Sequence, residues 1–192
     1  MRWVVGGRAT AGVAASATQM GRFETGVLAQ AGNLATLAGL SGRWIDVVRG
    51  RHPAKVVVLD MDSSVSPVFG EQEGSAYNGH FACTCYHPLF LFNQFGDLER
   101  CALGPGNVAS ADDWRSVLGP VIERYRDGAV NRRFFRGDAA FALPDLHEVL
   151  EAEGYKYAIR LKANSVLQRR IGHLLRRPRG RPSHHVRRFH DR

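Results

Sequence analysis

The spacing of apolar residues changes several times along this chain, and each change predicts a different kind of element. In residues 19–28 and 34–48, apolar side chains recur every three or four positions, which is typical of helices. Further helices are predicted at 112–125, 144–153 and 167–175. Strand patterns cover residues 55–59, 81–86, 88–95, 98–103, 133–136 and 157–161, with a hairpin turn at 93–97.

The order of these elements predicts the fold class. A strand, a β-hairpin and then alternating helices and strands favour an α/β protein with a mixed sheet and helices on its faces. We expect three segments: a helical N-terminal segment at 1–52, the sheet-containing core at 53–166, and a helix with a basic tail at 167–192. Residues 63–79, rich in Ser, Gly and Glu, are predicted to form a loop.

Two carboxylates follow the first strand. The four aliphatic residues 56–59 predict a strand that is buried on both faces and that leads directly into Asp60 and Asp62. Because side chains alternate along a strand, the two aspartates project to the same side. Two like charges are costly to desolvate without a partner, and a hard cation such as Mg²⁺ is the usual partner. The alternative is a strand that ends in polar residues at the surface.

A third carboxylate, Asp138, follows the short apolar strand at 133–136. The interval between Asp62 and Asp138 accommodates a hairpin, a helix and a return strand parallel to the first. Both acids are therefore expected at the same edge of one sheet, where they could share a metal ion. The alternative is that Asp138 caps the turn before the helix that begins at Pro144.

The positive charge of the chain is concentrated at one end. The net charge of the 192 residues is +8, but residues 162–192 alone contain ten Lys or Arg and one Asp. Such a block indicates a polyanionic partner, most often nucleic acid, although a solvated basic end is the alternative. The candidate DNA-binding residues are Lys162, Arg169, Arg170, Arg176, Arg177, Arg179, Arg181, Arg187 and Arg188. Residues 178–182, Pro-Arg-Gly-Arg-Pro, also resemble the AT-hook core that binds narrow minor grooves.

Composition excludes some classes of protein. No apolar run approaches the roughly 18 residues of a membrane span, and the N-terminus lacks the pattern of a secretory signal. Three cysteines are an odd number and suit a reducing cytoplasm. Cys83, Cys85 and His87 are spaced too closely for a typical zinc site, so core cysteines beside a turn histidine are the better interpretation.

Several of these motifs together resemble the DDE-type transposases of bacterial insertion sequences. Asp62-Ser63-Ser64 after a hydrophobic strand resembles their first acidic motif. The segment 136–142, Arg-Gly-Asp-Ala-Ala-Phe-Ala, followed by 144–146 and 157–162, resembles the second. The similarity runs from about Gly21 to near the C-terminus and also includes residues 78–80, 86–89 and 104–107.

The resemblance implies an RNase H-like fold in which three carboxylates hold two Mg²⁺ ions, with Mn²⁺ as a substitute, for in-line attack on a DNA phosphodiester. Asp62 and Asp138 would be two of these ligands. The third is a Glu in a Tyr-Arg-Glu-Lys signature, and this chain has no Glu after Leu161. Asp60 could replace it. We therefore expect a truncated fragment that performs no strand transfer alone.

The resemblance also implies partners and location. We expect transposon ends and target DNA as partners, a homo-oligomer, no membrane, and the bacterial cytoplasm. Two other hypotheses remain open. Asp60-Met61-Asp62 also resembles the opening motif of haloacid-dehalogenase-type phosphatases, in which Asp60 would be the nucleophile. A non-catalytic DNA-binding protein would use only the basic tail.

Overall fold

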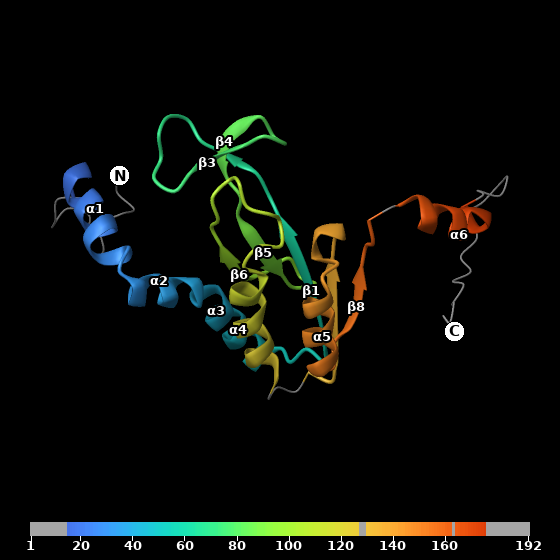
Figure 1. Cartoon of the computed structure of the whole chain (residues 1–192). Coiled ribbons are helices and arrows are strands. Elements are labelled where there is room, and N and C mark those ends of the chain that lie inside the picture. The colour runs from blue at the N-terminus through green and yellow to red at the C-terminus, as the bar shows by residue number, and fades with distance from the viewer. Residues whose placement is uncertain (1–14, 127–129, 163, 176–192) are drawn as a thin grey trace, which may run out of the picture. The chain divides into compact units, whose positions relative to one another are not determined.

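The computed structural model describes residues 15–126, 130–162 and 164–175. Its largest sheet is a five-stranded mixed sheet (Figure 1). Its strand order is β6-β5-β1-β7-β8. Strands β5 and β6 follow β1 as antiparallel neighbours, whereas β7 and β8 continue the sheet in parallel on its other side. The strands are β1 (Val56–Ser63), β5 (Leu89–Phe92), β6 (Leu98–Ala102), β7 (Arg132–Gly137) and β8 (Lys156–Ile159).

This topology confirms the predicted fold class. Three antiparallel strands followed by two parallel strands, with a helix before each parallel strand, are the arrangement of an RNase H-like fold. The antiparallel pairing of β1 with β5 differs from the parallel sheet that the phosphatase hypothesis requires. The chain divides into two compact units, Met1–Arg160 and Leu161–Arg192.

Helices form where apolar periodicity predicts them, but not all of them bury their apolar side: in α2 and α3 the predicted apolar residues at 34, 37, 40, 44, 47 and 48 are exposed. The predicted helix at 112–125 is α4, whose apolar side is buried as expected. The N-terminal helices α2 and α3 contact strand β6, and α5 contacts β8. The helices of this unit are α1 (Ala17–Phe23), the π-helix η1 (Glu24–Leu28), α2 (Ala31–Ala38), α3 (Leu40–Arg51), α4 (Trp114–Arg126), the 3-10 helix η2 (Ala139–Phe141) and α5 (Pro144–Ala152).

The hydrophobic core lies against one face of this sheet. Burial alternates along β1, so that Val57, Leu59 and Met61 are buried while the side chains between them are only half-buried. The buried residues of α4 and α5 belong to the same core cluster as these three side chains. The prediction that β1 is buried on both faces is therefore wrong. Within the described part of the first unit, the packed helices cover the odd-numbered face, and the even-numbered face stays partly open.

A second, three-stranded sheet lies in the segment between β1 and β5. Its order is β2-β4-β3, with β2 (Ser66–Pro67), β3 (Ala76–Asn78) and β4 (Cys83–Tyr86). The prediction of a structureless loop at 63–79 is therefore wrong, because β2 and β3 form within it. The strand predicted at 81–86 exists, but it pairs with these two short strands rather than with the central sheet.

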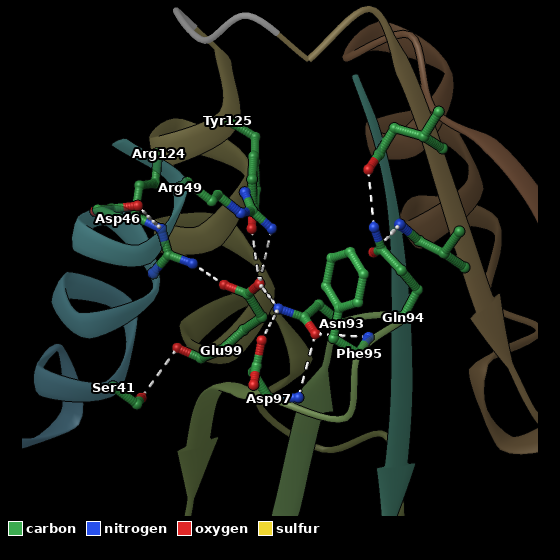
Figure 2. A network of polar contacts seen from close by, with 12 residues as sticks. Ser41, Asp46, Arg49, Asn93, Gln94, Phe95, Asp97, Glu99, Arg124 and Tyr125 are labelled. Carbon is green, nitrogen blue, oxygen red and sulfur yellow. Dashed lines mark hydrogen bonds and ion pairs between the residues drawn. The ribbon is translucent and has the colours of Figure 1, made fainter. Parts of the chain in front are cut away.

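A buried polar network fastens the N-terminal helices to the sheet, and Figure 2 shows it centred on Glu99. The Glu99 side chain is fully buried and forms an ion pair with Arg124 and a second one, at 3.4 Å, with Arg49. The hydroxyl of Tyr125 donates to Oε1 of Glu99 at 2.7 Å, and Nδ2 of Asn93 donates to the same oxygen at 2.9 Å. Because Arg49 belongs to α3 and Arg124 to α4, Glu99 joins two helices to strand β6.

Tyr155 leads to a pH-dependent prediction. Burial raises the pKa of Tyr155 to about 12, and its hydroxyl has no hydrogen-bond partner among the described residues. Above pH 10 the unfolded state releases this proton while the folded state retains it, so stability falls between pH 10 and 12 at about 1.4 kcal/mol per pH unit. We expect Tyr155→Phe to be nearly neutral at pH 7 and to remove this alkaline loss, as measured by urea denaturation.

The exposed Tyr77 provides the control for this prediction. Tyr77→Phe should leave the slope of stability against pH unchanged. If the curves of wild type and Tyr155→Phe run parallel from pH 9 to pH 12, the buried phenol does not contribute to the alkaline loss.

No helix in the described ranges is both long and apolar enough to span a membrane.

The second unit contains one described helix, α6 (Ser165–Leu175), which confirms the prediction of a helix at 167–175. Asn164 caps this helix, because its side-chain oxygen accepts a hydrogen bond from the backbone N–H of Leu167 at 2.8 Å. This cap explains why the helix begins slightly earlier than the apolar pattern suggests.

Candidate metal site

Parallel pairing of β1 and β7 brings the predicted acids together. In this register Asp60 lies opposite Arg136; β1 then continues to Asp62, whereas β7 ends at Gly137 and Asp138 follows it directly. Asp62 and Asp138 line one pocket of about 250 Å³, together with Asp60, Met61 and Phe92. The expected convergence of the two acids at one place on the sheet is therefore present. One detail differs from the prediction, because Asp60 and Asp62 lie within β1 and not beyond its end.

Each of the two pocket acids has one carboxylate oxygen held by the backbone. The N–H of Ser63 donates to Oδ1 of Asp62 at 2.8 Å, and the N–H of Ala140 donates to Oδ1 of Asp138 at 2.8 Å. The second contact makes Asp138 the N-cap of η2. The two interpretations of Asp138, turn cap and pocket acid, are thus compatible. In the described residues, Oδ2 of each carboxylate has no hydrogen-bond partner and is available to a ligand.

The turn that carries Asp138 depends on the glycine before it. A Cβ atom at Gly137 would lie 3.1 Å from Cβ of Phe141 and 3.3 Å from Cε1 of Phe135. Phe135 and Phe141 are both fully buried. The small residues of this motif therefore leave room for Phe141 of the chain itself, which packs into the core beneath the turn.

Asp60 differs from the other two acids because it has a cationic partner. Nη2 of Arg136 donates to Oδ2 of Asp60 at 2.6 Å across the two strands. Both side chains are about half exposed. Within the described ranges, no three His, Cys, Asp or Glu residues lie close enough together to hold one metal ion. Asp60 thus lines the pocket but does not complete a three-ligand cluster with Asp62 and Asp138.

The donor chemistry of the pocket fits one hard divalent cation. Two carboxylates that each offer a free oxygen are the ligands Mg²⁺ prefers, since it is commonly bound through one or two carboxylates and retains several waters. A two-metal centre requires more bridging oxygens than Asp62 and Asp138 provide. The described residues therefore fit a single ion.

Only part of the predicted DNA-binding set lies in the described ranges. Lys162, Arg169 and Arg170 are exposed residues of the second unit. The other predicted contacts, together with the AT-hook-like segment, lie outside the described residues: Arg176, Arg177, Arg179, Arg181, Arg187 and Arg188.

The prediction of core cysteines holds for Cys85 but not for Cys83, which is only half-buried. Cys85 is buried in β4, and Cys83 and Cys85 are both free thiols. Nδ1 of His87 lies 3.2 Å from the backbone oxygen of Val108. In the part of the chain that the structure describes, these residues belong to no metal cluster.

One family of known proteins matches this chain over its whole length. The family model described as transposase DDE domain group 1 matches residues 1–192. No curated protein sequence matches the chain. A cryo-EM structure of the piggyBac transposase synaptic complex with hairpin DNA has 20% identity over 68% of this chain and 27% of its own, with a TM-score of 0.36.

The Mos1 transposase paired-end complex with the left transposon end has 16% identity over 72% of this chain and 47% of its own, with a TM-score of 0.34. The present chain thus spans less than half the length of these two transposases. The match over all 192 residues assigns the family: the chain belongs to the transposase DDE domains of group 1.

Proposed function

We propose that this chain acts in DNA transposition as a catalytic-domain part of a DDE transposase, with Asp62 and Asp138 as ligands of a Mg²⁺ ion that Mn²⁺ can replace. The observation that carries the proposal is the arrival of both carboxylates in one pocket, each with one oxygen oriented by a backbone N–H and one oxygen free. Family membership supports it, because DDE transposases depend on a divalent metal ion.

The side chains of the pocket have separate tasks in this proposal. Asp62 and Asp138 bind the cation through their free oxygens and hold it against the open face of the sheet. Their backbone hydrogen bonds fix the orientation of each carboxylate before the ion arrives, which reduces the cost of binding. A bound divalent ion supplies Lewis-acid stabilisation of the phosphoryl oxygens and activates water or a 3′-hydroxyl for in-line attack.

The proposal includes a limit on catalysis. Two carboxylates satisfy one ion, whereas strand transfer by the two-metal mechanism needs a third acid. After Leu161 the only acidic residue in the sequence is Asp191. We therefore propose that this chain does not transfer DNA strands without an additional carboxylate.

DNA is the proposed partner, and transposon ends and target DNA are the expected forms. Ten Lys or Arg residues between 162 and 192 support this, since clustered positive charge releases counterions from phosphates. A homo-oligomer that brings two ends together belongs to the same proposal. The non-catalytic DNA-binding alternative shares this tail and differs in having no use for Asp62 and Asp138.

Binding of Mn²⁺, measured by electron paramagnetic resonance of the full chain, tests the proposed metal site. We expect Asp62→Asn and Asp138→Asn each to raise the Kd for Mn²⁺ at least about tenfold. Loss of a residue that only supports a metal ligand already lowers affinity by about 10- to 100-fold, and loss of a ligand itself should cost no less. The exposed Asp112, which does not line the pocket, provides a control of equal charge change. Wild-type affinity in both pocket variants would exclude this site and favour the non-catalytic alternative.

A further inference from the structure

Charged residues at the end of the paired strands β1 and β7 form two neighbouring groups on the open face of the sheet. The first group is the cross-strand ion pair of Asp60 and Arg136, whose formal charges cancel. The second group contains Asp62, two residues further along β1, and Asp138, which directly follows β7; both are acidic and line the pocket. The strand repeat of about 3.3 Å per residue places Asp62 about 6.6 Å beyond Asp60 along β1. The pocket acids therefore have a guanidinium as their neighbour along the strands.

We propose that Arg136 binds a phosphate of the DNA strand beside the pocket, and that Asp60 is a positioning residue for Arg136 and not a metal ligand. This inference rests on the proposed function, because it assumes that the pocket faces DNA. It extends that function by assigning a phosphate contact to a residue outside the basic tail and by giving Asp60 a separate role.

The hydrogen bonding of Arg136 supports this assignment. A guanidinium has five N–H donors in a planar fork that matches phosphate oxygens. Among the described residues, Arg136 donates from Nη2 to Asp60, and no other acceptor is present for its side chain. Its side chain is 55% exposed, so the remaining donors face solvent. Asp60 thus accepts a hydrogen bond from one nitrogen of the guanidinium, and the other N–H donors remain available to a ligand.

The acidic charges around the pocket support a role for the positive charge of Arg136 beside Asp60. Asp60, Asp62 and Asp138 would repel a DNA backbone if nothing balanced their charge. One divalent ion compensates Asp62 and Asp138, and Arg136 compensates Asp60. With both in place, the local formal charge no longer opposes a phosphodiester. An ion pair this exposed contributes little to stability, which argues against a purely structural purpose.

Strand β7 offers a matched control residue. Arg132 lies four residues before Arg136, so alternation places both on the same face of the sheet. It is exposed and lies opposite Val56 in the register, and no described carboxylate pairs with it. Arg132→Gln and Arg136→Gln therefore remove the same charge from the same face, but only the second removes it next to the pocket.

Binding of a random-sequence DNA duplex to the full chain, measured against salt concentration with Ca²⁺ present, tests the phosphate contact. We expect Arg136→Gln to lower the slope of log K against log salt by about one unit, as for the loss of one phosphate contact. Arg136→Lys should retain the slope and lose part of the affinity, because an ammonium cannot bind bidentately. Arg132→Gln should match the wild type. Equal slopes for Arg132→Gln and Arg136→Gln would overturn the inference.

Binding of Mn²⁺ tests the role of Asp60 independently of DNA. We expect Asp60→Asn to change the Kd for Mn²⁺ less than about threefold, whereas Asp62→Asn raises it at least about tenfold. An equal loss in both variants would make Asp60 a metal ligand and overturn its positioning role. If neither variant affects Mn²⁺ binding, the proposed function fails. If only the salt-slope result fails, the metal site stands and the phosphate contact does not.

Discussion

Replacement of Glu99 by alanine is expected to lower the free energy of unfolding by about 3–5 kcal/mol, the usual cost of breaking a buried ion pair from one side. The Glu99 carboxylate is fully buried between Arg49 and Arg124. Its removal leaves two guanidiniums in a poorly hydrated site, and it also removes the acceptor of Tyr125 and Asn93. Urea denaturation followed by circular dichroism measures the loss.

A neighbouring acid of the same network provides the comparison for Glu99. Asp46 lies 3.3 Å from Nε of Arg124, but its side chain is 48% exposed. Water can replace this partner, so Asp46→Ala should cost less than about 1 kcal/mol. If Glu99→Ala and Asp46→Ala destabilise the protein equally, burial of the carboxylate is not what makes Glu99 important.

The second large effect is expected from Gly106→Ala, which should destabilise the protein by about 1–3 kcal/mol or more. A Cβ atom at this position would meet the backbone oxygen of Ala76, and it would lie 2.5 Å from the backbone oxygen of Cys85 and 2.6 Å from its Sγ atom. Backbone oxygens of paired strands cannot move aside as a flexible side chain can. The substitution would also disturb the hydrogen bond from Nδ2 of Asn78 to the oxygen of Gly106, at 2.6 Å.

Thermal denaturation of Gly106→Ala and Gly79→Ala compares a filled position with an open one. No atom lies within 4 Å of a Cβ placed at Gly79. Gly79→Ala is therefore expected to change stability by less than about 0.5 kcal/mol, or to raise it slightly through the unfolded state. Wild-type stability of Gly106→Ala would show that the small sheet β2-β4-β3 can separate from Gly106 at little cost.

Apolar periodicity predicts the long helices of this protein, but burial on one side explains the pattern only in part, because most apolar residues of α3 are exposed. Helix α4 is the clearest case, since its apolar positions all face the core. Strand β1 shows the limit of the same approach. Four consecutive aliphatic residues are compatible with burial on one face or on both, and the positions of the helices decide between them. Those positions follow from chain connections that no local pattern contains.

The short strands β2 and β3 could not be predicted for a different reason. They have two and three residues, which is too few for any alternation of polar and apolar positions to show. Their pairing with β4 defines them, and Ser-Pro or Ala-Tyr-Asn has no strong strand preference. Local sequence predicts a turn-rich segment there, and the partner strand converts part of it into a sheet.

The candidate site shows the same division between local and long-range information. The approach of Asp62 and Asp138 follows from the order of the elements between them. The pairing of Asp60 with Arg136 depends on the register of two strands far apart in the sequence, which a single sequence does not reveal. Glu99 was missed because a lone Glu in a strand usually indicates a solvent-facing position, and its partners Arg49 and Arg124 come from distant helices.

Gly137 makes the position of Asp138 inseparable from the integrity of the hydrophobic interior. Phe141 packs where a side chain at position 137 would lie. A larger residue at position 137 would therefore displace the buried ring of Phe141 and, with it, the turn that carries Asp138. A mutation at this glycine should therefore have two effects: it lowers the stability of the protein, and it displaces the carboxylate of Asp138. Variants that test the proposed metal site should therefore change positions other than this one.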